Sequence, residues 1–172
     1  MLNVGECVIY GNHGLCKVRE ILVPPFLERG NEKQYYMMVS AVDAGSVIYV
    51  PVDGAEDKVR DVMSAEDAEG LIVDIEEVEE IELPDGKKAE PEIVGIIKRN
   101  IAEEMMRLVK ALHKNKAVRE SEGKKFAALN EKYLHIAEKL LYTEMAFALK
   151  TEKDAVKERV IDELSHLPLE TA

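Results

Sequence analysis

Few side chains in this chain combine the types and spacing that catalysis or metal binding requires. Cys7 and Cys16 lie within runs of β-forming residues, and the chain has no other cysteine. We expect both thiols to be reduced and to act as small apolar core residues. His13 precedes Gly14 and could serve as a base, but a turn histidine bonded to its own backbone is the more common case. The 4 scattered histidines predict no metal site.

Two further patterns resemble ligand sites but lack essential residues. Gly123-Lys124-Lys125 suggests a phosphate loop, yet position 118 is valine and no serine or threonine follows the lysines. The glutamates between positions 76 and 82 lack the Asp, Asn and Gly spacing of a calcium loop. We therefore predict that the protein is not an enzyme and holds no cofactor, and keep a small enzyme only as a third alternative.

The apolar run from Val47 to Val52 is the first feature that indicates binding. Pro51 favours an edge strand, because proline cannot donate a hydrogen bond in a central ladder. An exposed edge can accept a strand from another protein, with Tyr49 as an anchor if its ring points outward. A buried core strand is the equal alternative.

A second feature is a cluster of cations in an acidic protein. The net charge is −11, but residues 92–150 hold 12 Lys and Arg against 8 Asp and Glu. Such asymmetry indicates an anionic partner, while an ordinary solvated helix face is the alternative. The cations concerned are Lys98, Arg99, Arg107, Lys110, Lys114, Lys116, Arg119, Lys124 and Lys125.

The elements that must position these features fall into two halves. Short β-rich runs at residues 4–10, 15–23, 34–41 and 46–52, separated by glycine and proline turns, predict a small bent sheet or barrel. From residue 92 the apolar spacing becomes helical and predicts three amphipathic helices, interrupted near Gly123 and closed by Pro168.

Between the halves lies an acidic stretch with a short helix capped by Ser64. Residues 75–83 fit either helix or extended chain, and we expect extended chain after Glu80. We expect an α+β protein of two domains: a small β-barrel over 1–62, an acidic connector over 63–91 and an all-α domain over 92–172. No apolar run approaches the roughly 20 residues that cross a bilayer, and the N-terminus lacks the blocks of a secretory signal. We therefore expect a cytoplasmic protein with no membrane contact.

Several motifs together resemble a known family. Gly5-x-x-Val8-Ile9-Tyr10 with His13-Gly14, then Tyr35-Tyr36, then Ile48-Tyr49-Val50-Pro51-Val52 resemble the domain shared by CarD-type bacterial transcription regulators and the transcription-repair coupling factor. The helical half resembles clostridial-type CarD proteins, from Gly123-Lys124-Lys125 through Asn130-Glu131-Lys132-Tyr133 to Glu144-Met145-Ala146. The chain is too short for a translocase and carries no helicase motif, which excludes the coupling factor.

The resemblance implies a Tudor-like, SH3-like barrel that binds the RNA polymerase β subunit and a helical domain that contacts upstream promoter DNA, stabilising the open complex. It implies polymerase contacts at Ile48, Tyr49, Val50 and Pro51. The DNA backbone contacts that it implies are Lys98, Arg99, Lys110, Lys114, Lys116, Lys124 and Lys125. The family's minor-groove tryptophan has no counterpart, because the chain has no tryptophan, and Leu83 falls near its place.

The alternative is an adaptor that binds the polymerase or another protein and has no DNA contact. The acidic total charge and the missing tryptophan favour it, whereas the locally basic helical segment opposes it. The sequence leaves open a monomer or a weak homodimer, as well as activation or repression.

Overall fold

The computed structural model describes residues 1–169. They divide into two compact units, which we call the sheet unit (residues 1–62) and the helical unit (residues 63 onward). Residues 63–91, expected to form a connector, belong to the helical unit.

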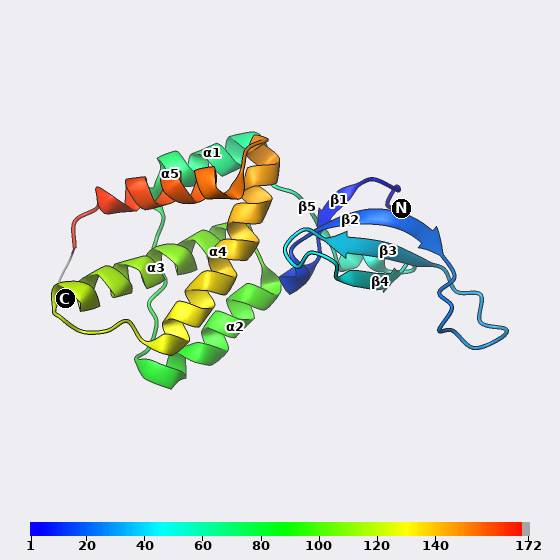
Figure 1. The fold of residues 1–172 in the computed structure, drawn as a ribbon, viewed down its shortest axis with the longest axis horizontal. Coiled ribbons are helices and arrows are strands. Elements are labelled where there is room, and N and C mark those ends of the chain that lie inside the picture. The colour runs from blue at the N-terminus through cyan, green and yellow to red at the C-terminus, as the bar shows by residue number, and fades with distance from the viewer. Residues whose placement is uncertain (170–172) are drawn as a thin grey trace. The chain divides into compact units, whose positions relative to one another are not determined.

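The sheet unit is a curled antiparallel sheet in the order β4-β3-β2-β1-β5, a Tudor-like half-barrel (Figure 1). Short 3₁₀ turns cover Gly11–His13 and Ala55–Asp57. The chain turns between β3 and β4 at Gly45, whose φ of 93° is open to glycine at no steric cost. The strands are β1 (Cys7–Ile9), β2 (Leu15–Leu22), β3 (Tyr35–Ser40), β4 (Val47–Pro51) and β5 (Arg60–Asp61).

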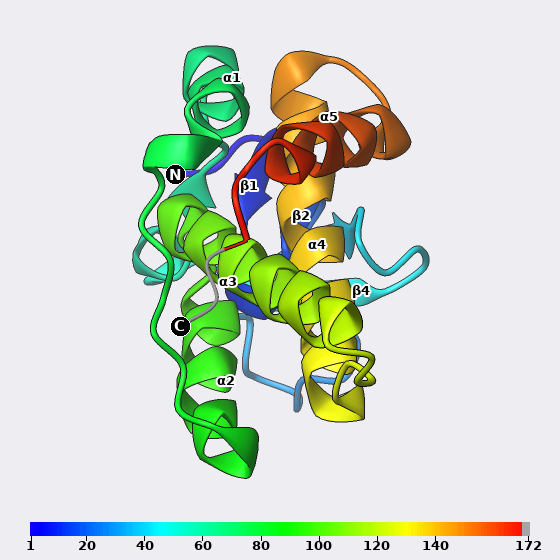
Figure 2. The same cartoon turned by 90° about the vertical axis from the view of Figure 1, so that its left-hand side faces the viewer.

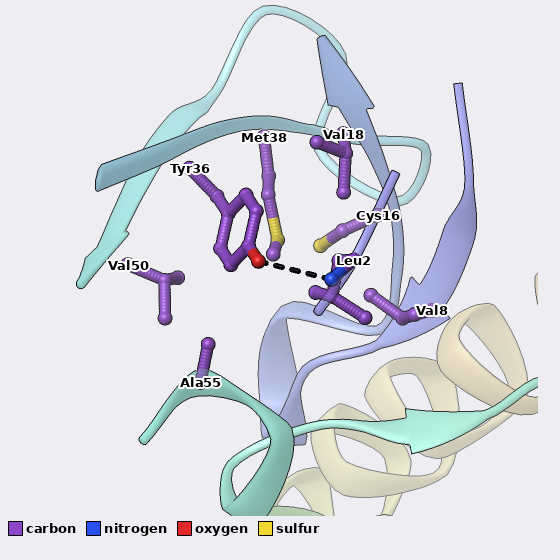
Figure 3. Packing of buried hydrophobic residues seen from close by; sticks show 8 residues of the cluster. All are labelled: Leu2, Val8, Cys16, Val18, Tyr36, Met38, Val50 and Ala55. Atoms are coloured by element: carbon purple, nitrogen blue, oxygen red, sulfur yellow. Dashed lines mark hydrogen bonds between the residues drawn. The ribbon is translucent and has the colours of Figure 1, made fainter. Parts of the chain in front are cut away.

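The core of the sheet unit gathers the inward residues of these strands (Figure 3). The Leu2 N–H donates a hydrogen bond of 2.9 Å to the Tyr36 hydroxyl, which satisfies a buried polar group. Cys16 is fully buried and Cys7 is partly buried, and neither cysteine forms a disulfide in the described structure. Burial raises the pKa of Cys16 to about 11, so its thiol stays protonated. The core residues are Leu2, Val8, Cys16, Val18, Tyr36, Met38, Val50 and Ala55.

The helical unit contains five α-helices within the described residues (Figures 1 and 2). The predicted cap of the first helix is confirmed, because the Ser64 side chain accepts a hydrogen bond of 3.0 Å from the Asp67 N–H. Helix α4 packs against α1, α3 and α5 and so forms the centre of the unit. The helices are α1 (Ala65–Val73), α2 (Glu90–Arg99), α3 (Ala102–Ser121), α4 (Ala128–Leu149) and α5 (Lys153–Ser165), with 3₁₀ turns at Ile75–Glu77 and Gly86–Ala89. The predicted α+β architecture is confirmed.

One predicted helix is in fact two. Residues 92–112 have continuous apolar spacing, yet α2 ends at Arg99 and α3 begins at Ala102. Asn100 adopts the left-handed conformation at φ 45°, and its N–H bonds to the Ile96 carbonyl at 2.9 Å. Asparagine tolerates this C-terminal geometry. Neither glycine nor proline marks the break, so it carries no strong sequence signal.

Candidate protein-docking edge and cationic helix

Strand β4 is an edge strand, as Pro51 predicted. It pairs antiparallel with β3, with Tyr49 opposite Met37 and Pro51 opposite Tyr35. Its other side has no strand partner among residues 1–169. A row of backbone groups along β4 is therefore available to an incoming strand.

The hydrogen bonds at the two ends of this ladder fix which backbone groups are available. The carbonyl of Ser46 accepts from the Ser40 N–H at 3.2 Å, and the N–H of Val52 donates to Gln34 at 3.1 Å. Alternate residues of an antiparallel pair direct their backbone groups to the same neighbour. Even-numbered positions thus face β3, and odd-numbered positions face outward. The residues that direct their backbone groups to the free edge are Val47, Tyr49 and Pro51.

These three residues offer an asymmetric set of groups. Val47 and Tyr49 each present an N–H and a carbonyl, whereas Pro51 presents a carbonyl alone. A strand added here would find complete pairing sites at Val47 and Tyr49 and a reduced one at Pro51. Pro51 therefore removes one possible hydrogen bond to an added strand but leaves those at Val47 and Tyr49.

The same residues form an apolar face on the outside of the sheet. The β3–β4 register places Val47 opposite Val39 and Tyr49 opposite Met37, away from the core. Val47 is 49% exposed and Tyr49 is 36% exposed. Phe26, from the loop before β3, adds an exposed ring at 5.2 Å from the Tyr49 ring in edge-to-face geometry. Exposed apolar residues gathered in this way are typical of a binding surface.

The four predicted polymerase contacts do not share one face. Tyr49 and Pro51 lie on the outer face, whereas Ile48 and Val50 point to the core side. Val50 is fully buried, as Figure 3 shows, so its side chain cannot touch a partner on the native sheet. Val47, Met37 and Phe26 share the outer face with Tyr49 and were not among the predicted contacts. The first two could have been found from the period of two along a strand.

Comparison with known proteins assigns the sheet unit. Residues 2–63 match the family model of the CarD-like/TRCF RID domain. The chain carries a CarD-like domain. This confirms the predicted family resemblance over the whole curled sheet. No curated protein matches the chain.

The CarD-like domain is an RNA polymerase-interacting domain, so it supports a polymerase-binding transcription factor. Domains of this family act in protein interaction and are not catalytic. The exposed strand edge and its apolar outer face are the features of the sheet unit that suit such an interaction. In the helical unit, none of the helices between residues 63 and 169 is both long and apolar enough to span a membrane.

The predicted DNA contacts lie in the helical unit, and Lys110 does not have the exposed charge that its predicted role requires. Its side chain is buried on α3, only 5% exposed. The ammonium donates to three backbone carbonyls, those of Ile75 at 2.8 Å, Glu76 at 3.0 Å and Val78 at 2.7 Å. All three ammonium protons have partners, so Lys110 is a structural residue and does not present a charge to phosphate.

The neighbouring cations on α3 are also paired within the helical unit. Arg107 donates through Nε to the Glu79 carbonyl at 3.0 Å and lies 3.8 Å from its carboxylate. Lys114 pairs with Glu80 at 2.9 Å. The acidic segment after α1 therefore neutralises this side of the helix.

The remaining predicted contacts are more accessible. Lys98 and Lys125 are exposed. Arg99 pairs with Glu104 at 3.0 Å, and Lys124 pairs with Glu122 at 3.2 Å. These pairs have exposed side chains and are weak.

Two predicted residues are only partly exposed. Lys116 lies over the Phe126 ring, 5.7 Å from its centroid, and Leu83 is half-buried. Both keep some surface through which they can contact a partner.

A part-buried polar contact joins α3 to α4. His113 Nε2 lies 3.2 Å from Glu138 Oε2. Burial alone would raise the pKa of Glu138, but the hydrogen bond and charge of His113, with help from Tyr142 and Lys157, hold that pKa below its usual value. Residues 1–169 contain no group of His, Cys, Asp and Glu side chains arranged to hold a metal.

Proposed function

We propose that this protein is a transcription regulator that docks on the RNA polymerase β subunit through the β4 edge of its sheet unit. The helical unit then contacts upstream promoter DNA and stabilises the open complex. The unpaired edge of β4, with its exposed apolar outer face, carries this proposal. The match to an RNA polymerase-interacting domain supports the choice of partner.

The docking mode follows from the chemistry of the edge. A strand of the β subunit would pair with the backbone of Val47 and Tyr49, which gives affinity without demanding a particular sequence. Its apolar side chains would pack on Tyr49, Met37 and Phe26, where burial of apolar area contributes about 25 cal/mol per Å². Specificity would come mainly from this packing.

The predicted DNA contacts whose charges are not paired with the acidic segment after α1 lie away from Lys110 and Lys114. Lys98, Lys124 and Lys125 have exposed charges, and Arg99 and Lys116 can reorient at little cost. Leu83 could serve as an apolar wedge at a base step. Binding to the open state alone would shift the promoter equilibrium towards it by mass action.

The docking half is tested by co-elution of the full chain with a β-lobe fragment. Tyr49→Asp places a charge on the outer face and should abolish co-elution. Val4→Asp is the matched control, because Val4 is also an exposed apolar residue of the sheet unit, at 60% exposure, but lies outside β4. Retention of the complex by Tyr49→Asp would remove the proposed interface.

A second candidate is a polymerase-bound adaptor without DNA contact. The internal pairing of Arg107, Lys110 and Lys114 favours it, since these cations lie against the protein's own acidic segment. Footprinting of a polymerase–promoter complex with and without the protein separates the two. Added protection upstream of the bubble supports the regulator with DNA contact, and an unchanged footprint supports the adaptor.

A further inference from the structure

The acidic segment that follows α1 lies along a row of cations on α3. Arg107, Lys110 and Lys114 are spaced by three and four residues, so they share one face of the helix. Every one of them bonds to residues between Ile75 and Glu80. We call residues 75–82 the acidic strap and these three cations the cationic row.

The strap has the chemistry of a short polyanion. Its carboxylates and carbonyls occupy the positions that phosphate oxygens would take on the cationic row, and both kinds of oxygen accept hydrogen bonds from Arg and Lys. We propose that the acidic strap is an intramolecular competitor for polyanions, which holds the cationic row closed until nucleic acid displaces its outer part. The strap's carboxylates belong to Glu76, Glu77, Glu79, Glu80 and Glu82.

The contacts between the strap and α3 are stronger at the Lys110 end than at Glu79 and Glu80. Lys110 is buried and bonded to three carbonyls, so this end is a fixed anchor. The Glu79 side chain is 87% exposed beside Arg107 at 39%, and Lys114 and Glu80 are 28% and 32% exposed. The Arg107–Glu79 ion pair is long and open to water, so it contributes little and is screened by salt. The Lys114–Glu80 pair is part-buried but still reaches solvent. The outer part can therefore detach while the anchor stays in place.

Detachment would remove the contacts that Arg107 and Lys114 make with the strap and open this side of α3 to an external phosphate chain. Each phosphate that a protein cation neutralises releases condensed counterions and steepens the salt dependence of binding. The closed strap thus keeps the affinity for free DNA low. The high local DNA concentration in a polymerase-bound complex would favour the open arrangement. This inference rests on the DNA-contacting half of the proposed function.

The test compares two variants of equal charge by binding of the full chain to a fluorescein-labelled DNA duplex at low salt. Glu79→Gln with Glu80→Gln removes the carboxylates that pair with the cationic row. Glu76→Gln with Glu77→Gln is the matched control, because both side chains are exposed and make no ion pair among residues 1–169. Both double variants keep the backbone carbonyls that bind Lys110. Thermal melts verify that each variant folds.

The expected result is that the Glu79/Glu80 variant binds DNA about three- to tenfold more tightly than the control, with a steeper salt dependence. Equal affinities would overturn the proposal, since net charge alone would then account for binding. Failure of both variants to bind would also overturn it, because release of the strap would have exposed no polyanion site. The readout contains no polymerase, so its failure leaves the docking half of the proposed function to be judged by co-elution.

Discussion

The two units treat their binding groups in opposite ways. In the sheet unit, the free edge of β4 has no strand partner among the described residues, and apolar side chains around Tyr49 stay exposed. In the helical unit, the cations of α3 that look most suited to DNA are bonded to the protein's own acidic strap. The type of a residue therefore indicates what its side chain can bind, whereas its pairing within the protein decides whether that side chain is available to a partner.

The comparison within β4 predicts the largest effect. Val50→Asp buries an unpaired carboxylate in the core of the sheet unit, and we expect it to cost about 4 kcal/mol or more, enough to unfold this unit. Tyr49→Asp, one position away on the outer face, should cost less than about 1 kcal/mol. Chemical denaturation followed by circular dichroism measures both. Similar costs at the two positions would contradict the alternation of faces along β4.

In the helical unit, replacement of Lys110 tests whether its buried ammonium stabilises the fold. Lys110→Met keeps much of the side-chain volume but leaves three backbone carbonyls, one buried and two part-buried, without this donor, so we expect a loss of about 2–4 kcal/mol in the free energy of unfolding. Lys98→Met, on the exposed side of α2, serves as the control and should change stability by less than about 0.5 kcal/mol. Urea unfolding gives both values. A stable Lys110→Met variant would show that the lysine is solvated and free for phosphate.

A smaller effect is expected from the contact between α3 and α4. The pKa of Glu138 is lowered in the folded state, so its contribution to stability is complete above the unfolded value near 4.5 and is lost as the pH falls through the lower folded pKa. Glu138→Gln should therefore flatten the acid limb of the stability curve below about pH 4.5. Thermal melts between pH 3 and 7 would reveal it. An acid limb identical to that of the parent chain would assign acid sensitivity to other carboxylates.

The sequence predicted local features well where one residue dictates geometry. Pro51 indicated an edge strand, Ser64 a helix cap and Gly123 a break between helices, and the structure has all three. Each of these depends on a backbone constraint that acts within a few residues. The α+β class followed from the change of apolar period near residue 64.

Long-range pairing was the part that the sequence could not supply. Lys110 resembles any other helix lysine until the segment after α1, more than 30 residues away in the chain, folds against α3. The break at Asn100 lacked a glycine or proline signal. Ile48 and Val50 were grouped with Tyr49 because the motif was treated as a unit, although a strand presents alternate residues to opposite faces.

The most direct test of the account is amide hydrogen exchange of the full chain, free and bound to RNA polymerase. Strand addition predicts that the Val47 and Tyr49 amides exchange fast in the free protein and become protected in the complex. The Ile48 and Val50 amides, bonded towards β3, should be protected in both states. Unchanged fast exchange at Val47 and Tyr49 in a demonstrated complex would contradict docking through the β4 edge.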